Sequence, residues 1–382
     1  MIVAGGFHQR GGMDRANAAL AAYLLGSGTP VHLVGHEIDP ELSGHSLATV
    51  HTVVRPKGMP ATAERLLARA GVRVAQSVVK EAPRARVVVN GGNCPWPDIN
   101  WVHAVHAVWP VRDEGAPWWS RYRNRRLKRF ARLRERAALG QAAVVIANSE
   151  ATRRAIVEAL GIGRERVCTI YLGSDPAWGA SDARERAAAR AALRMPDGAP
   201  VVVFMGALGS DVNKGFDVLW DAWQRLTASG TWDGRLVVAG TGWRLRAWRD
   251  RAARGGRSSV QFIGITPRVR ELLAAGDLLV SPARYEAYGL NVHEALCRGL
   301  AVMVTRSAGV VERFDSGMSE ALLPADVTAP VLAERLRVWR GDMNGWRRRS
   351  AGTAARLRAR SWSDMAAGLV AVAQTAPKRF PA

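Results

Sequence analysis

Short apolar runs alternate with helical stretches twice along this chain of 382 residues, and no other feature limits its fold so strongly. In the first half, runs with the length of buried strands lie at residues 1–6, 31–37, 85–92, 99–106 and 142–149. Segments with helical spacing, such as 13–28, separate them. Strands alternating with helices predict a parallel sheet that is covered on both faces.

The alternation stops at 175–200, a segment of prolines, glycines and charges that we interpret as a linker, and then resumes. The second set of apolar runs lies at 201–210, 234–242, 259–265, 276–282 and 301–307. We therefore predict an α/β protein of two doubly wound, Rossmann-like domains that face each other across a cleft. The predicted boundaries are 1–185, 186–360, and a C-terminal helix at 361–382 that packs back on the first domain.

Several classes of protein conflict with the composition. No apolar run approaches the roughly 20 residues of a membrane-spanning helix, and the N-terminus lacks the pattern of a signal peptide, so we expect a cytoplasmic protein. Cys94, Cys168 and Cys297 stand far apart without a CxxC pair, which argues against a disulfide framework and against a zinc site.

The chain is strongly basic, with 54 Lys and Arg against 33 Asp and Glu and a formal charge of +21. This excess favours anionic partners, whether nucleic acid, acidic lipid or phosphorylated substrates, although a compositional bias without function explains it equally well. In the arginine-rich stretch 121–136, an apolar stripe at helical spacing is formed by Trp119, Tyr122, Leu127, Phe130, Leu133 and Ala137. It predicts a surface helix packed on its own domain or, alternatively, a contact with a membrane surface.

The stretch "RYEAYGLNVHEALCRGL", 284–300, follows a predicted buried strand and reads as a loop that enters a helix. Gly289, Leu290 and Asn291 would lie at the helix N-terminus, where free N–H groups and the helix dipole make a phosphate cradle. Glu286 would precede this cradle, and Glu294 would follow one turn into the helix. Such carboxylates can accept hydrogen bonds from sugar hydroxyls. The alternative is a plain surface loop and a solvated helix face.

A second loop of the same half points to a nucleotide. Lys214 precedes Gly215 where an amphipathic helix begins, and a lysine there would meet a diphosphate as a point charge. Two further strands end in glycines near Gly242 and Gly264, and we expect the pocket for the base in the loops that follow these glycines.

In combination, the ordered motifs "GALG…NKGFD", "VVAGTG", "VQFIG", "GDLLVSP", "E-x7-E" and "GLAVMVTRSAG" resemble the donor domain of the retaining glycosyltransferases of family 4, which have the GT-B fold. The resemblance implies that Glu286 contacts the donor sugar and Glu294 the ribose. It also implies that Lys214, Gly289 and Leu290 hold the diphosphate, with Tyr288 and Asn291 beside them. Ala207 stands where the family usually carries an arginine, so another residue must supply that cation.

The first predicted domain contains fewer candidate functional residues. His103 and His106 lie near the end of a predicted strand, and similar enzymes place a histidine there beside the reacting sugar. Trp101 and Trp109 would stack on a sugar ring. A purely structural role for the histidines is the alternative. In the first glycine loop, Gly11 and Gly12 would face the donor phosphates or the acceptor.

From these features we predict a retaining hexosyltransferase that moves a sugar from a UDP- or GDP-linked donor to a saccharide or lipid-linked acceptor. No DxD-like acidic pair is found at a strand end, so we expect no metal ion and no other cofactor. A lipid-linked acceptor would bring the protein to the inner membrane face. The alternatives are a sugar-nucleotide epimerase of the same architecture and a basic nucleic-acid-binding protein. A dinucleotide oxidoreductase is disfavoured because no GxGxxG follows a strand at the required spacing.

Overall fold

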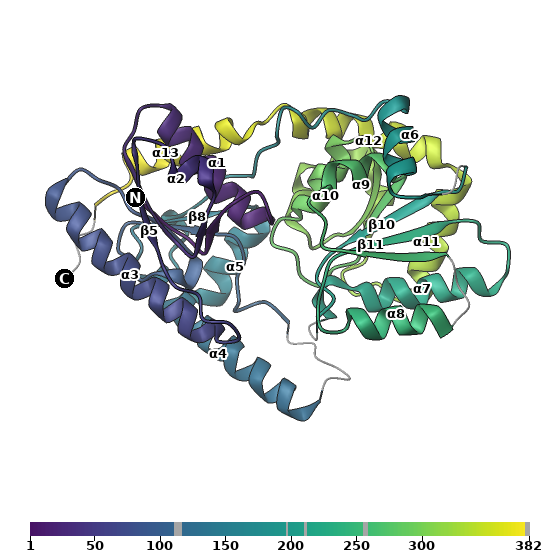
Figure 1. Ribbon diagram of the computed structural model, residues 1–382, viewed down its shortest axis with the longest axis horizontal. Coiled ribbons are helices and arrows are strands. Elements are labelled where there is room, and N and C mark those ends of the chain that lie inside the picture. Colours follow the sequence, from purple (N-terminus) through teal and green to yellow (C-terminus); the bar gives the residue numbers. More distant parts are fainter. Residues whose placement is uncertain (111–116, 196–197, 210–211, 255–258, 379–382) are drawn as a thin grey trace. The chain divides into compact units, whose positions relative to one another are not determined.

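The computed structural model describes residues 1–110, 117–195, 198–209, 212–254 and 259–378. The chain forms two compact units, and each contains its own parallel sheet (Figure 1). The first unit consists of Met1–Trp109, Trp118–Gly173 and Arg360–Ala382, and the second chiefly of Ser174–Ala359. The predicted pair of doubly wound α/β domains is confirmed.

The first unit is built on a seven-stranded sheet in the order β5-β3-β1-β6-β7-β8-β9, with every neighbouring pair parallel. Its strands are β1 (Ile2–Val3), β3 (Val31–Gly35), β5 (Ala48–Thr52), β6 (Val88–Asn90), β7 (Ile99–Val102), β8 (Val144–Ala147) and β9 (Val167–Thr169). A separate pair is formed by β2 (Gly6–Phe7) and β4 (Glu37–Ile38). When the strands of the main sheet are numbered in chain order, their arrangement begins 3-2-1-4-5-6, which is the strand order of a Rossmann fold. The direction in which strands are added reverses between β1 and β6.

Helices connect these strands, as parallel pairing requires. They are α1 (Gly12–Gly26), α2 (Pro40–Ser43), α3 (Pro60–Glu81), α4 (Trp118–Gln141), α5 (Glu150–Leu160) and, from the other end of the chain, α13 (Trp362–Thr375). Helix α13 packs beside α1 (Figure 1). Arg86 secures it, because its Nε donates to the carbonyl of Ala373 at 2.6 Å.

The second unit has a six-stranded parallel sheet in the order β12-β11-β10-β13-β14-β15. The strands are β10 (Val201–Met205), β11 (Arg235–Ala239), β12 (Val260–Gly264), β13 (Leu278–Ser281), β14 (Ala301–Thr305) and β15 (Leu322–Leu323). The helices are α6 (Ala183–Ala192), α7 (Phe216–Ala228), α8 (Leu245–Arg254), α9 (Val269–Ala275), α10 (Leu290–Cys297), α11 (Ala329–Gly341) and α12 (Met343–Arg358). Here the strand order reverses between β10 and β13.

Apolar side chains explain the stability of this second sheet. Strands β10, β13 and β14 are buried on both faces, as expected for strands covered by helices on both sides. In Figure 1, α7, α8 and α11 lie on one side of the sheet, and α9, α10 and α12 lie on the other.

The structure differs from the sequence prediction within 175–200. Helix α6 occupies part of this segment, and Asp182 caps it by accepting a hydrogen bond from the N–H of Glu185 at 2.7 Å. The alanine- and arginine-rich helix was hidden by the flanking proline and glycine residues, which suggested an irregular linker.

Only the middle of the apolar stripe predicted for the arginine-rich helix packs, because Leu127 and Phe130 are half-buried. Trp119, Tyr122 and Leu133 are exposed, whereas the fully buried Glu135 is the side chain that anchors α4. The Glu135 carboxylate accepts hydrogen bonds from the backbone N–H groups of His106 and Ala107 at 2.9 and 3.2 Å. Hydrogen bonds to an acidic side chain therefore help to orient this helix, and the apolar periodicity predicted its packed face only in part.

Candidate active site

The loops that leave β10 and β13 meet at the point where the strand order of the second sheet reverses. Ligands of doubly wound sheets bind outside the carboxyl ends of the strands at such a point. The loop after β10 begins at Gly206 and ends at α7, and the loop after β13 begins at Pro282 and ends at α10. Six of the ten residues predicted to bind the donor lie on these two loops or on α10, which follows the second loop: Lys214, Tyr288, Gly289, Leu290, Asn291 and Glu294.

The N-terminus of α10 has the geometry of an anion site. Gly289 precedes the helix with φ of +101°, a conformation that other residues rarely adopt, and any side chain there would press on Val310. Among the residues that the structure describes, the N–H groups of Leu290 and Asn291 have no hydrogen-bond acceptor. Two free donors at the positive end of a helix favour a bound phosphate.

The two glutamates of the E-x7-E motif are not solvated surface residues. Glu294 lies on α10 and is 8% exposed, and Glu286 is half-buried in the loop before the helix. The segment at Gly309 and Val310 holds the loop that carries Glu286. Gly309 N–H donates to the Glu286 carbonyl, and Val310 N–H donates to the Tyr288 carbonyl. The alternative of a plain surface loop is therefore wrong for this stretch.

Lys214 ends a short 3-10 turn, Val212–Lys214, and its Nζ lies 2.5 Å from Oε2 of Glu286. This pairing joins two predicted site residues that are 72 positions apart in the chain. The backbone brings them together at Gly215, where a side chain would overlap the carbonyl of Pro282. Gly215 also has φ of +72°, so its conformation and its surroundings both favour glycine.

A further set of contacts joins the two loops. Asn213 Nδ2 donates to the carbonyl of Tyr285 at 2.9 Å, and the N–H of Arg284 donates to the Asn213 carbonyl at 2.8 Å. Arg284 also forms a bidentate ion pair with Asp217 on α7, at 2.9 and 2.6 Å. The position of Lys214 relative to Glu286 is thus fixed by backbone and side-chain hydrogen bonds.

Two other predicted donor-binding residues are engaged within the protein. Asn291 Nδ2 donates to the Met205 carbonyl at 3.2 Å, which links the start of α10 to the end of β10. Tyr288 is 3% exposed, and its hydroxyl lies 2.7 Å from Nδ1 of His293. The side chains of Asn291 and Tyr288 therefore hold the backbone of the cradle in position through hydrogen bonds within the protein.

The glycines after the other strands differ in position. Gly242 allows the loop after β11 to approach the loop after β10, since a side chain would overlap the backbone of Leu208 and Gly209. Gly264 ends the edge strand β12, two strands away from β10. Of these two predicted glycines, Gly242 is the one that lies against the loop that carries Lys214.

A small hollow beside Lys214 contains a residue that the sequence did not reveal. Ala207, Lys214 and Arg244 all line it. Arg244 comes from the segment before α8, and its guanidinium lies 5.5 Å from the centre of the Trp248 ring. A cation therefore stands close to the position where the expected arginine is replaced by Ala207.

In the first unit, Gly11 and Gly12 form the start of α1, and Gly11 has φ of +102°. Asp14 of the first helical turn lies beside this loop, with its Oδ2 3.7 Å from Nε2 of His8. Burial raises the pKa of Asp14 above its ordinary value, and the nearby positive charges partly offset this effect. The sequence analysis did not predict this His8–Asp14 pair.

His103 and His106 follow the end of β7, as predicted, but their environments differ. The Nε2 of His103 is buried and has no hydrogen-bond partner in the described part of the chain. Burial lowers the pKa of His103 to about 3, so its ring is neutral near pH 7. The Nδ1 of His106 lies 3.1 Å from Oε1 of Glu135, and its side chain is 41% exposed.

The prediction that Trp101 stacks on a sugar is wrong. Trp101 is fully buried, and its ring packs against that of His103 with centroids 4.3 Å apart. It lies on β7 within a sheet covered on both faces, so its ring belongs to the core. Trp109 is half-buried, with its ring stacked near that of His106 at 6.0 Å.

A buried chain of hydrogen bonds connects the α10 cradle to the start of the second unit. Ser174 Oγ donates to the Leu357 carbonyl at 2.7 Å and lies 2.6 Å from Nε2 of His293. Since the hydroxyl proton of Ser174 is used, Nε2 of His293 donates, and Nδ1 accepts from Tyr288. This arrangement requires a neutral imidazole, in agreement with burial that lowers the pKa of His293 to about 3.

The structure thus brings together Lys214, Glu286, Gly289, Leu290, Asn291 and Glu294 at one edge of the second sheet. It places Gly11, Gly12, His103 and His106 in the first unit. Within the described ranges, no three His, Cys, Asp or Glu side chains are grouped so that they could hold a metal ion.

Comparison with known proteins identifies the type of chain. Residues 199–338 match the family described as "Glycosyl transferases group 1", and residues 10–178 match "Glycosyltransferase Family 4". The D-inositol 3-phosphate glycosyltransferase of Nocardia farcinica is 30% identical over 247 residues, which are 62% of this chain and 53% of that protein. The chain therefore spans about half the length of this curated relative.

Two solved structures share the fold. WaaG, a glycosyltransferase involved in lipopolysaccharide biosynthesis, superimposes with a TM-score of 0.79 and 20% identity, covering 98% of this chain and 99% of its own. HepE of Anabaena, solved in complex with UDP and glucose, has a TM-score of 0.68 and 17% identity, covering 98% of each chain. At these identities the likeness shows the fold alone, and it confirms the predicted GT-B architecture.

The neutral state of His293 has a consequence for pH dependence. The unfolded chain takes up a proton at this histidine below about pH 6.5, whereas the native pKa is about 3. The contribution of this histidine to stability is therefore complete above about pH 7 and is lost as the pH falls, by up to roughly 1.4 kcal/mol per pH unit. We predict that His293→Gln melts at a lower temperature than wild type at pH 7.5 but loses less stability between pH 7 and 5. Scanning calorimetry measures the melting temperature and its change with pH. If the stabilities of the two proteins changed in parallel with pH, His293 would not be the buried neutral histidine described above.

Proposed function

Because the chain belongs to the glycosyltransferases of group 1 and family 4, we propose that it transfers a sugar from a nucleotide-sugar donor to a saccharide or lipid-linked acceptor. The observation that carries this proposal is the cradle at the start of α10, which combines free N–H groups, Lys214 and two carboxylates. An anion site with flanking carboxylates suits a ligand that has phosphates between two sugars, because the carboxylates can accept hydrogen bonds from hydroxyl groups.

In this proposal the diphosphate of the donor binds at the N-terminus of α10 and is neutralised by Lys214. The ammonium of Lys214 has three protons, and one is directed at Glu286, so others remain for phosphate oxygens. The same ion pair orients the Glu286 carboxylate toward the hydroxyls of the donor sugar. The buried carboxylate of Glu294, on α10, accepts hydrogen bonds from the ribose.

We propose that Arg244 supplies the second cation that Ala207 does not provide. Both residues line the same hollow as Lys214, and the small side chain of Ala207 leaves space for a guanidinium. Arg244 is half-buried against Trp248, which restricts its movement without removing its charge. A guanidinium is suited to bidentate hydrogen bonding with phosphate oxygens.

In the first unit, we propose that His103 contributes as a neutral hydrogen-bonding group near the reacting sugar. Its pKa of about 3 rules out a positive charge at neutral pH, and its Nε2 lacks a partner within the described ranges. An orphaned buried nitrogen is costly unless a ligand satisfies it. His106 is held by Glu135 and is more accessible, so we assign it a supporting role at the acceptor.

We also propose that transfer retains the anomeric configuration, uses a UDP- or GDP-linked hexose and requires no metal ion. The charge of a leaving diphosphate would be met by Lys214, Arg244 and the N–H groups of α10, so this chain has its own groups for electrostatic stabilisation. The HepE structure with UDP and glucose supports a uridine-linked donor, although it describes a different protein.

Helix α4 supports a further proposal, that the protein contacts an anionic membrane surface through its first unit. Trp118, Trp119 and Tyr122 at the start of α4 are 74%, 53% and 60% exposed. Arginines are interleaved with these rings, with Arg123 5.4 Å from the Trp119 ring centre. Basic residues with aromatic side chains between them suit the head-group layer of a bilayer. In the described part of the chain, no helix is long and apolar enough to cross a membrane.

The two glutamates should differ in their effects on catalysis. We predict that Glu294→Gln weakens nucleoside diphosphate binding about tenfold or more and changes kcat little, because a ribose contact is equal in ground and transition states. Glu286→Gln should mainly lower kcat, by roughly 2–3 kcal/mol of transition-state stabilisation. The rate at which nucleoside diphosphate is released from UDP-glucose and GDP-mannose, measured in EDTA, gives kcat. Inhibition of the same reaction by added nucleoside diphosphate gives its binding constant. Glu334→Gln, on the exposed face of α11, is the matched control, and two variants as active as this control would refute the site.

The membrane proposal predicts salt-sensitive co-sedimentation with phosphatidylglycerol vesicles. Binding should fall when Arg123, Arg125, Arg126 and Arg129 on α4 are changed to glutamine, since each basic residue near the surface contributes about 1 kcal/mol. The control changes four exposed arginines of α8, Arg246, Arg249, Arg251 and Arg254, and removes the same charge. Equal loss in both variants would indicate a response to net charge alone, and equal binding to neutral vesicles would exclude the electrostatic contact.

A further inference from the structure

A second pocket of the second unit lies away from the α10 cradle. Its volume is about 400 Å³, and its lining includes Gly276 and Leu300. Gly276 precedes β13 and Leu300 precedes β14, whereas Glu286 follows β13. Because the strands are parallel, the pocket lies at the opposite edge of the sheet from the candidate active site.

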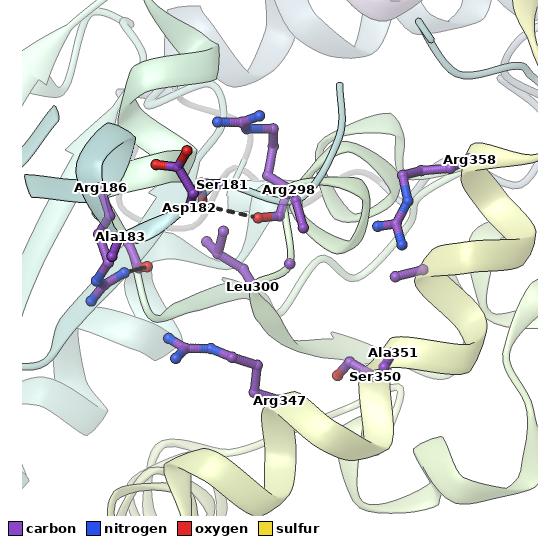
Figure 2. Close-up of a pocket in the computed structure, with 14 residues that line it drawn as sticks. Ser181, Asp182, Ala183, Arg186, Arg298, Leu300, Arg347, Ser350, Ala351 and Arg358 are labelled. Carbon is purple, nitrogen blue, oxygen red and sulfur yellow. Dashed lines mark hydrogen bonds between the residues drawn. The ribbon is translucent and has the colours of Figure 1, made fainter. Parts of the chain in front are cut away.

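Arginines dominate the polar lining of this pocket. Figure 2 shows Arg186 on one side, Arg347 and Arg358 reaching in from α12, and Leu300 between them. Arg298 also lines the pocket but is buried, with its guanidinium directed at the Gly179 carbonyl and the Glu185 carboxylate. The pocket thus contains three guanidinium groups from two elements, α6 and α12, that can reach a ligand.

The acidic residues nearby do not balance this charge. The buried carboxylate of Asp277 is shared by Arg186, Arg190 and Arg347, at 2.5, 2.7 and 3.2 Å. Arg358 donates to the Cys297 carbonyl at 3.0 Å, and no carboxylate partner for it occurs in the ranges that the structure describes. Asp182 also lines the pocket, and Glu185 pairs with Arg298. Even with these carboxylates counted, the arginines around the pocket are in excess, and this surplus of positive charge favours an anion.

The remaining lining determines the kind of anion. The carboxylate of Asp182 caps helix α6 at the pocket, so the N-terminus of this helix is already paired and the arginines are the groups available to an anion. Small apolar side chains, among them Leu300 and Ala354, form the floor. Guanidinium groups match phosphate oxygens in planar, bidentate geometry, and an apolar floor accepts a carbon skeleton.

We propose that this pocket is a second binding site, distinct from the donor cradle, for a small phosphomonoester such as a sugar phosphate. The phosphate binds at Arg358, the lining arginine with no carboxylate partner among the described residues, and the carbon part lies over Leu300 toward Arg347. Because the pocket and the α10 cradle are at opposite edges of one sheet, the two sites bind their ligands through separate residues. The proposal does not depend on the transfer reaction described above.

The test is a calorimetric titration of the full chain with glucose 6-phosphate, inorganic phosphate and glucose. We expect saturable binding of glucose 6-phosphate, at least tenfold weaker in Arg358→Gln and weakened to a smaller extent in Arg347→Gln, with no binding of glucose. Arg347 is 46% exposed, and its replacement leaves Asp277 paired with Arg186 and Arg190, so the fold should persist. If inorganic phosphate bound as tightly as glucose 6-phosphate, the result would support an anion site and would identify free phosphate as its ligand.

Three variants complete the experiment. Ala351→Glu, on the exposed surface of α12 at the pocket, should abolish binding without removing any structural contact of an arginine. Arg337→Gln on α11 and Lys214→Ala at the donor cradle should bind glucose 6-phosphate as wild type does. Loss of binding in Lys214→Ala would place the ligand at the cradle and overturn the proposal, as would equal weakening in Arg337→Gln or no binding to wild type.

Discussion

The close approach of two loops, at Gly215 and Pro282, is the constraint on which the candidate active site depends. The backbone of Gly215 comes so near the Pro282 carbonyl that no side chain fits between them. This contact brings the loops after β10 and β13 together, and Asn213 bonds to Tyr285 across them. Lys214 and Glu286 can pair only because the backbone has already been placed in this way. Functional geometry in this unit therefore follows from backbone packing at the reversal of strand order.

Much of this arrangement could be predicted from the sequence, because it depends on local patterns. The apolar runs predicted the strands, and the glycine before α10 predicted the cradle, since both signals lie within a few residues. The pairing of Lys214 with Glu286 and the position of Arg244 beside Ala207 could not be predicted, because they depend on contacts between distant loops. Helix α4 shows a different limit, since the buried carboxylate of Glu135 helps to orient it and leaves Trp119, Tyr122 and Leu133 of the predicted apolar stripe exposed.

Positive charge in this protein is organised at particular places. Lys214 pairs with Glu286 beside the α10 cradle and shares a hollow with Arg244, and a separate group of arginines surrounds the pocket at the other edge of the same sheet. A third group lies on α4 between exposed aromatic rings. A compositional bias explains the number of arginines, but it does not explain why they gather around hollows and beside aromatic side chains. The ligands proposed for these three regions have a phosphate group in common.

The central claim is that a nucleoside diphosphate binds between Lys214 and the N-terminus of α10. Its most direct test is the calorimetric affinity of wild type, Lys214→Ala and Lys214→Ala/Glu286→Gln for UDP and GDP. Lys214→Ala should bind the preferred nucleotide at least tenfold more weakly, because a cation is lost and Glu286 is left unpaired beside the diphosphate. The double variant should recover part of that loss, since it removes the unpaired carboxylate. Unchanged affinity in Lys214→Ala for both nucleotides would contradict the account.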